Sequence, residues 1–110
     1  RCGVRIIGDI PIYVSSDSAD VWSESRCFAL DRREHTPRLV SGVPPDLFSR
    51  TGQLWGHPVY DWRELERRRF DWWVERIRRL LDRVDLVRID HFRGLAAFWA
   101  VEARATTALK

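Results

Sequence analysis

The stretch LVRIDHFRG, Leu86 to Gly94, decides the fold because ionisable side chains stand at the end of an apolar run. Side chains alternate along a strand, so Val87 and Ile89 would face one side of the sheet. Arg88 and Asp90 would then face the other. We predict that an amphipathic helix covers the Val87 side. In a barrel of parallel strands, Asp90 would lie at the carboxyl end, where residues are typically catalytic.

The chemistry of this strand end is compatible with two roles. Arg88, two residues before Asp90, supplies a positive neighbour that favours the ionised carboxylate. An ionised, positioned carboxylate suits the nucleophile of a glycosidase. The alternative is a structural ion pair that closes the strand, and both readings stay open on this pattern alone. His91 is either a core histidine or a hydrogen-bond donor to a substrate. A metal site is not predicted, because no second histidine stands at ligand spacing.

A second carboxylate follows an earlier apolar run, from Val4 to Val14. This run predicts a strand buried on both faces, which ends near the turn residues Gly8-Asp9 and Pro11. Gly8 permits close approach of a neighbouring element. Asp9 is either a site carboxylate or a turn residue that accepts hydrogen bonds from its own backbone.

An amphipathic helix is predicted between these strands. Apolar residues recur at steps of three and four along it, at Phe70, Trp73, Val74, Ile77, Leu80, Leu81 and Val84. Its other face is rich in arginine, with Glu75 and Asp82. We favour a solvated face with ion pairs over a phosphate-binding face. The order strand, long excursion, helix, strand predicts a right-handed βαβ unit with parallel strands.

The excursion between the first strand and the helix is expected to be mostly irregular. Ser16, Asp17 and Ser18 are N-cap candidates for a short helix. Residues 23–51 have no sustained period, which predicts a functional loop. Aromatic and polar side chains in residues 42–62 suit a sugar ring, or else the aromatics, Tyr60 and Trp62 above all, hold the loop onto the protein. Residues 94–101 are expected to form a loop or a short helix.

Composition sets broad limits on the function. The net charge of +3 implies no nucleic-acid partner. No apolar run is long enough for a membrane span, and we expect a cytoplasmic protein. Cys2 and Cys27 are expected to stay reduced. The sequence lacks methionine and begins inside a strand pattern, so we expect an internal piece of a longer protein.

Three blocks of the sequence resemble the 4-α-glucanotransferases of glycoside hydrolase family 77, also called amylomaltases or disproportionating enzymes. The blocks are GDIPIYVSSDSADVW (Gly8–Trp22), GVPPDLFSRTGQLWGHPVYDW (Gly42–Trp62) and VRIDHFRG (Val87–Gly94) followed by AFWAV (Ala97–Val101). The resemblance implies an α/β fold, a (β/α)₈ TIM barrel. Residues 1–110 would be part of that catalytic domain, about its third and fourth strands with the long loop and the helix between them.

The resemblance also implies a retaining transfer of α-1,4-glucan segments to the 4-hydroxyl of a glucan or glucose. Its partners would be maltodextrins, maltose and glucose, with no cofactor, metal, nucleic acid or membrane. Asp90 falls on the nucleophile, and Arg88 positions it. The implied substrate-binding residues are Asp9, Asp46, Phe48, Gln53, Trp55 and His91.

Some features depart from the family or are missing. Leu47 stands where the family commonly has tyrosine, and His57 where it has asparagine, which affects the acceptor side. The acid/base glutamate of the family lies beyond Lys110, so the chain alone is expected to be inactive. The alternatives are an α-glucan hydrolase of the same barrel clan and a non-catalytic glucan-binding fragment.

Overall fold

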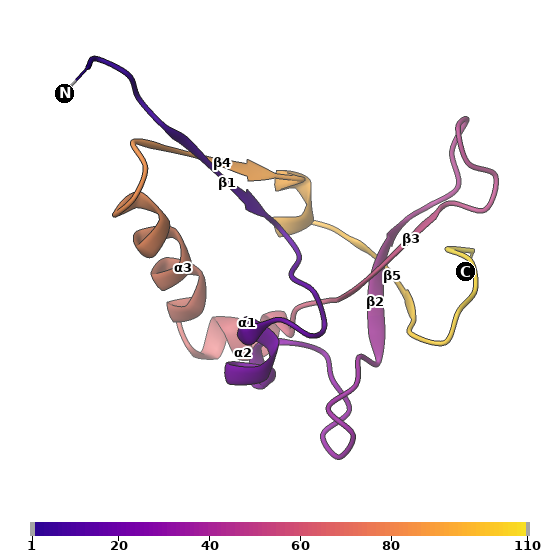
Figure 1. Cartoon of the computed structure of the whole chain (residues 1–110). Coiled ribbons are helices and arrows are strands. Elements are labelled where there is room, and N and C mark those ends of the chain that lie inside the picture. Colours follow the sequence, from indigo (N-terminus) through magenta and orange to yellow (C-terminus); the bar gives the residue numbers. More distant parts are fainter. Residues whose placement is uncertain (1, 110) are drawn as a thin grey trace.

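Two parallel strands carry the charged sequence stretches. The computed structural model describes residues 2–109. Strand β1 (Ile7–Pro11) pairs in parallel with β4 (Leu86–Asp90), and Figure 1 shows the two strands side by side. The predicted parallel pairing is confirmed. Because the strands are parallel, their carboxyl ends lie at the same edge of the sheet.

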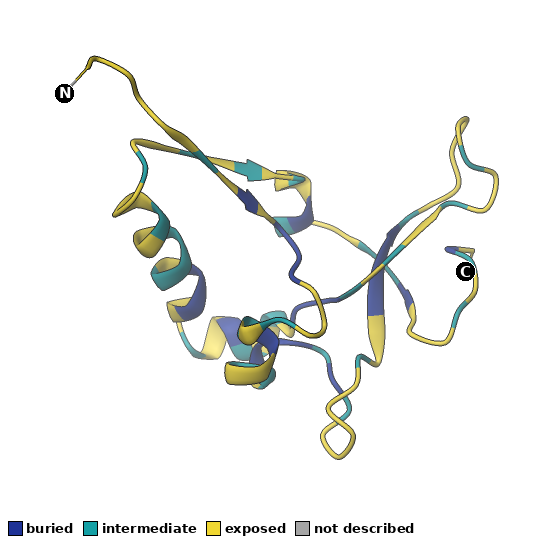
Figure 2. Ribbon diagram, in the orientation of Figure 1, coloured by how far each residue is buried: buried dark blue, intermediate teal, exposed yellow. Residues whose placement is uncertain are grey.

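The expectation that the first strand is buried on both faces is wrong for the described residues. Ile7 is 65% exposed and Leu86 43% exposed, and Figure 2 shows much of both strands exposed. The sheet of β1 and β4 has only two strands, so each strand has one unpaired edge among residues 2–109. One face is covered by a helix, and the other carries the charged side chains.

The covering helix is α3 (Asp71–Leu81), which follows α2 (Trp62–Arg67). The prediction of a helix after Phe70 is confirmed, but its buried face is shifted. Trp72 and Trp73 are both buried, whereas Val74 is 48% exposed. The two indoles pack against Phe28 and Tyr60 in an aromatic cluster, and this cluster is broad enough to take two consecutive residues.

The other face of α3 is solvated, as predicted, and carries ion pairs. Glu75 accepts from Arg78 at 3.1 Å and from Arg79 at 2.7 Å. Arg76 differs from its neighbours because its guanidinium lies over both indoles, 5.1 Å from the Trp72 ring and 5.2 Å from the Trp73 ring. Arg76 therefore belongs to the aromatic cluster rather than to the solvated face.

Close contact between β1 and α3 depends on Gly8. A β-carbon at this position would lie 2.9 Å from Val84 Cγ2 and 3.1 Å from both δ-carbons of Leu80. Val87, its partner across the sheet, packs against the same core as Leu80. Both strands thus turn one face to the end of the helix, as the alternation in the sequence predicts.

Short helices occupy the turn after β1 and the turn after β4. Helix α1 (Ala19–Ser23) begins at the predicted N-cap Ser18, whose hydroxyl accepts the N–H of Val21 at 3.3 Å. Two 3₁₀ helices follow, at Ser25–Cys27 and at Phe92–Leu95.

A second sheet lies within the region that was expected to be irregular. Its strands are β2 (Leu39–Val43), β3 (Gln53–Pro58) and β5 (Trp99–Glu102), in the antiparallel order β3-β2-β5. The expectation of irregular chain over residues 23–51 is therefore wrong at β2, and residues 94–101 end in a strand. The sequence conceals β2 and β3 because Gly42, Gly56 and Pro58 interrupt them.

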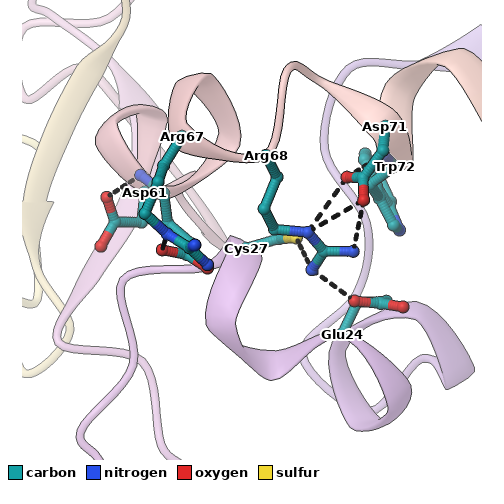
Figure 3. Close-up of polar contacts among 8 residues, drawn as sticks. Glu24, Cys27, Asp61, Arg67, Arg68, Asp71 and Trp72 are labelled. Atoms are coloured by element: carbon teal, nitrogen blue, oxygen red, sulfur yellow. Dashed lines mark hydrogen bonds and ion pairs between the residues drawn. The ribbon is translucent and has the colours of Figure 1, made fainter.

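Arg68 ties the turn after β1 to the helices, as Figure 3 shows. Its Nη1 donates to Glu24 at 2.7 Å and to the Cys27 sulfur at 3.3 Å, and its Nε lies 3.0 Å from Asp71. Burial raises the pKa of Cys27 to about 11. Cys27 and the exposed Cys2 are both free thiols, as expected.

Candidate active site

Three charged side chains meet at the strand ends. The register places Asp9 beside Arg88 and Pro11 beside Asp90. Arg88 donates twice to Asp9, from Nε to Oδ1 at 2.9 Å and from Nη2 to Oδ2 at 3.0 Å. The same Nη2 donates to Asp90 Oδ1 at 3.1 Å. Arg88 therefore lies between two carboxylates, of which sequence analysis had paired it only with the second.

The electrostatics of this cluster follow from that geometry. The two hydrogen bonds from the Arg88 guanidinium hold the pKa of Asp9 below its usual value of 3.8. The three side chains are 54–62% exposed, so this charged strand end is open to solvent in the described residues. No helix or strand among residues 2–109 covers this face of β1 and β4. Asp9 is an ion-pair partner here, not a turn residue that only serves its own backbone.

His91 begins a tight turn directly after Asp90. Its backbone is left-handed, with φ 50°, and its carbonyl accepts the N–H of Gly94 at 2.8 Å. A β-carbon on Gly94 would lie 3.1 Å from His91 Cδ2 and 3.1 Å from Ile12 Cγ1. The glycine thus lets the imidazole fold back over the chain that follows β1.

The imidazole meets an aromatic ring from the second sheet. Trp55, on β3, lies edge-on to His91 with ring centroids 5.1 Å apart and planes at 80°. Trp55 Nε1 donates to Gln53 Oε1 at 3.1 Å. Three of the predicted substrate-binding residues, Gln53, Trp55 and His91, are therefore brought together, although two come from β3 and one follows β4.

Sequence analysis missed Tyr13 at this place. Its ring lies 6.2 Å from that of Trp55 and 6.5 Å from that of His91. The signal available was a single aromatic residue shortly after Asp9. An aromatic in a run of buried residues is usually a core residue, so this signal alone could not single it out.

Asp46 and Phe48 are not brought to this cluster. They lie in the loop between β2 and β3, which Figure 1 shows projecting away from β1 and β4. Asp46 Oδ1 accepts the N–H of Phe48 at 2.8 Å and that of Ser49 at 2.7 Å, which closes the loop tip. Phe48 is 96% exposed and Leu47 completely exposed. Phe48 therefore does not hold the loop onto the protein, whereas Tyr60 is buried in the core.

A cavity of about 1130 Å³ lies elsewhere, lined by residues from 25–39 and 60–67. None of the predicted site residues lines it. Two of its acids are already engaged: Asp31 accepts two backbone N–H groups, and Asp61 caps α2. The chemistry therefore points to the strand ends, where two carboxylates share one guanidinium.

Among residues 2–109 no helix is long and apolar enough to cross a membrane. No group of three or more His, Cys, Asp or Glu residues there is arranged to hold a metal ion.

Comparison with known proteins settles the family. The family model described as 4-alpha-glucanotransferase, glycoside hydrolase family 77, matches residues 1–110. This chain belongs to the 4-alpha-glucanotransferase family. Among its curated relatives in this family, the chloroplastic/amyloplastic 4-alpha-glucanotransferase of Arabidopsis thaliana is 58% identical over 109 residues, which are 99% of this chain and 19% of that protein. That of Clostridium butyricum is 54% identical over 105 residues, 96% of this chain and 22% of that protein.

A solved structure from the 4-alpha-glucanotransferase family has the same fold. The amylomaltase from Streptococcus agalactiae, in complex with acarbose, matches with a TM-score of 0.91 and 46% sequence identity. The match covers 96% of this chain and 21% of that one. The chain thus spans about a fifth of the length of the 4-alpha-glucanotransferases that it matches.

Proposed function

We propose that this chain supplies the nucleophile and part of the sugar-binding surface of a 4-alpha-glucanotransferase. The observation that carries the proposal is the cluster in which Arg88 bonds both Asp9 and Asp90 at the ends of paired parallel strands. The names of the relatives, which are 4-alpha-glucanotransferases from plants and bacteria, support the same activity.

Asp90 is the proposed nucleophile. Its carboxylate oxygen attacks the anomeric carbon of an α-1,4-linked glucose, and the bond from that carbon to the departing 4-oxygen breaks. A glycosyl ester on Asp90 results. The 4-hydroxyl of an acceptor sugar then attacks the same carbon and releases Asp90, so the configuration is retained. Arg88 orients the carboxylate, and Asp9 fixes Arg88 by its two hydrogen bonds.

His91, Trp55 and Gln53 form the proposed sugar-binding surface beside the nucleophile. The ring faces of an indole and an imidazole suit a pyranose, which is apolar on its faces and carries hydroxyls around its rim. The Gln53 amide, held against Trp55, adds hydrogen-bonding groups. Asp46 and Phe48 are proposed to act on the acceptor side, which requires the projecting loop to close over the bound glucan.

A retaining mechanism needs a second carboxyl about 5–5.5 Å from the nucleophile to act as acid and then base. Asp9 is unsuited to this role because its bonds to Arg88 favour the ionised form and lower its pKa. We propose that the acid/base group lies outside residues 1–110. Residues 1–110 would then be part of a (β/α)₈ barrel, about its third and fourth strands, and inactive by themselves. The edges of β1 and β4 that are unpaired among residues 2–109 fit this arrangement, since a barrel pairs every edge.

The substrates proposed are maltodextrins and maltose, with glucose as an acceptor. Acarbose is the compound in the complex of the S. agalactiae relative. The cytoplasmic location expected from the sequence stays a prediction, because the A. thaliana relative is named as chloroplastic/amyloplastic.

The test is incubation of the full-length protein with maltotriose and chromatography of the products. We expect glucose and a ladder of longer maltodextrins. Asp90→Asn should lower kcat/KM by about a thousandfold or more, about 4 kcal/mol of transition-state stabilisation. Asp82→Asn, a matched change at an exposed aspartate that follows α3, should leave the ladder intact.

Other outcomes would change the assignment. Glucose and maltose without longer products would indicate a hydrolase of the same barrel clan. Binding of maltodextrin without any turnover would indicate a glucan-binding protein. A ladder that survives Asp90→Asn would mean that another carboxylate is the nucleophile. Activity of residues 1–110 alone would contradict the placement of the acid/base group.

A further inference from the structure

Tyr13 lies between the protein core and the proposed sugar-binding surface. It follows β1 and is 7% exposed. On one side its ring stacks on Tyr60, with centroids 6.1 Å apart and planes at 19°. On the other side it meets Trp55 edge-on, at 6.2 Å and 62°, and His91 at 6.5 Å. Tyr13 thus contacts both aromatic members of the sugar-binding surface.

The core side of this contact is rigid. The Tyr60 hydroxyl donates to the carbonyl oxygen of Ile12, the residue before Tyr13. Tyr60 is 3% exposed and packs against further aromatic rings, among them Phe28 and Trp73. Tyr60 therefore holds both the backbone beside Tyr13 and the Tyr13 ring. Tyr13 thus presents a fixed surface to the residues outside it.

Trp55 and His91, the two residues outside it, share Tyr13 as a ring contact. Trp55 comes from β3 and His91 from the turn after β4, and no backbone hydrogen bond pairs these two strands. His91 makes two ring contacts in the described residues, one with Trp55 and one with Tyr13. Without the Tyr13 ring, Trp55 and His91 would both lose the ring contact that they share.

The ring and not the hydroxyl makes these contacts. Among residues 2–109 the Tyr13 hydroxyl has no hydrogen-bond partner, in contrast to that of Tyr60. Burial raises the pKa of Tyr13 to about 12, so the phenol is neutral at physiological pH. A phenylalanine would therefore preserve every Tyr13 contact described above.

We propose that Tyr13 is a positioning residue that holds Trp55 and His91 in place for the sugar beside Asp90, and that it acts through its ring. The kinetic part of this inference rests on the proposed function, because the two residues matter to catalysis only if they bind the glucan. The structural part, that Tyr13 fixes the two rings, can be measured without any activity.

The structural test uses three variants of the full-length protein: Tyr13→Phe, Tyr13→Leu and the matched control Phe28→Leu. Phe28 is buried like Tyr13 but, within the described part of the chain, has ring contacts with Tyr60 and Trp72 only. The readout is the indole N–H resonance of Trp55, assigned by its loss in Trp55→Phe. We expect the resonance to shift or broaden in Tyr13→Leu and to keep its position in Tyr13→Phe and Phe28→Leu.

The kinetic test measures KM and kcat for maltotriose in the same variants. The free energy lost with an aromatic contact predicts a roughly two- to tenfold rise in KM for Tyr13→Leu. Tyr13→Phe should restore the wild-type KM. Phe28→Leu should lower the melting temperature, as Tyr13→Leu does, without the rise in KM.

Each result decides one point. An equal rise in KM for Phe28→Leu would show that Tyr13 has only a structural role. Equal losses in Tyr13→Phe and Tyr13→Leu would show that the hydroxyl acts, and would overturn the proposal. An unchanged Trp55 resonance in Tyr13→Leu would also overturn it. Absence of transfer in the wild type would instead overturn the proposed function, while the Trp55 resonance would still decide whether Tyr13 positions the ring.

Discussion

Arg88 and Asp9 are 79 residues apart in the chain and form a two-pronged ion pair, with N–O distances of 2.9 and 3.0 Å. This planar, bidentate contact is specific to arginine and fixes the guanidinium in orientation as well as in position. The third bond, to Asp90, therefore comes from a nitrogen whose place is set by Asp9. Asp9 therefore orients Arg88, and Arg88 in turn orients the proposed nucleophile.

The first prediction concerns the titration of Asp9. A carboxyl whose pKa is lowered in the folded state contributes stability that is present above its usual pKa and lost as pH falls through the lowered value. We expect the Asp9 carboxyl, followed by carbon-13 NMR in the full-length protein, to titrate below 3.8. Arg88→Gln should return its midpoint to about the usual value for aspartate. Arg93→Gln, at a nearby exposed arginine, is the control. Identical midpoints with and without Arg88 would contradict the pairing.

The second prediction concerns the projecting loop. Phe48 is 96% exposed, so Phe48→Ala should change the free energy of unfolding by less than about 0.5 kcal/mol. If the loop closes over the acceptor, the same variant should raise KM for the acceptor glucose and increase the share of hydrolysis. Val74→Ala, a truncation on the exposed face of α3, should change neither. A variant with normal transfer would place the acceptor away from this loop.

The third prediction concerns the close contact at Gly8. The β-carbon of Gly8→Ala would come within 2.9 Å of Val84 Cγ2, so we expect a loss of about 1 kcal/mol in unfolding free energy. The cost is at the low end of overpacking because the obstructing atoms are side-chain ends. Val84→Ala should relieve part of it, so the double variant should be more stable than the sum of the single changes predicts. Chemical denaturation measures this, and strict additivity would contradict the contact.

The fourth prediction separates the two thiols. The thiolate is the reactive form of cysteine, and burial raises the pKa of Cys27 to about 11. At pH 8 about a thousandth of it would be ionised, and the side chain is also buried. A short pulse of iodoacetamide followed by peptide mass spectrometry should therefore label Cys2 and spare Cys27. Labelling of both should appear after denaturation, and equal labelling in the native protein would contradict the burial.

Sequence reasoning succeeded where a local period carries the information. The alternation in LVRID placed Val87 against the helix and Arg88 beside Asp90, and the three- and four-residue spacing located α3. It failed at the sheet of β2, β3 and β5. There β5 is far from its partner β2 in the chain, and Gly42 and Gly56 remove the side chains that would mark an alternation in β2 and β3.

The candidate site was predictable to a similar extent. Asp9, Arg88 and Asp90 carry charges at strand ends and could be found from chemistry. The contact of Trp55 with His91 depends on how β3 lies against the turn after β4, which no local pattern encodes. Tyr13 is hidden for another reason: in sequence, a tyrosine that supports a site is identical to one that merely fills a core.

The pairing of β1 with β4 also has a consequence for the order of folding. It closes a chain loop of 79 residues. Contacts of such high sequence separation form late, because the chain loses entropy on closing the loop before the contact can stabilise it. The hairpin of β2 and β3 and the helix α3 are local and can form first. During synthesis Asp9 is made well before Arg88 and Asp90, so it has no ion-pair partner until Arg88 is made. The three charges can therefore meet only after all of the chain between them has been made.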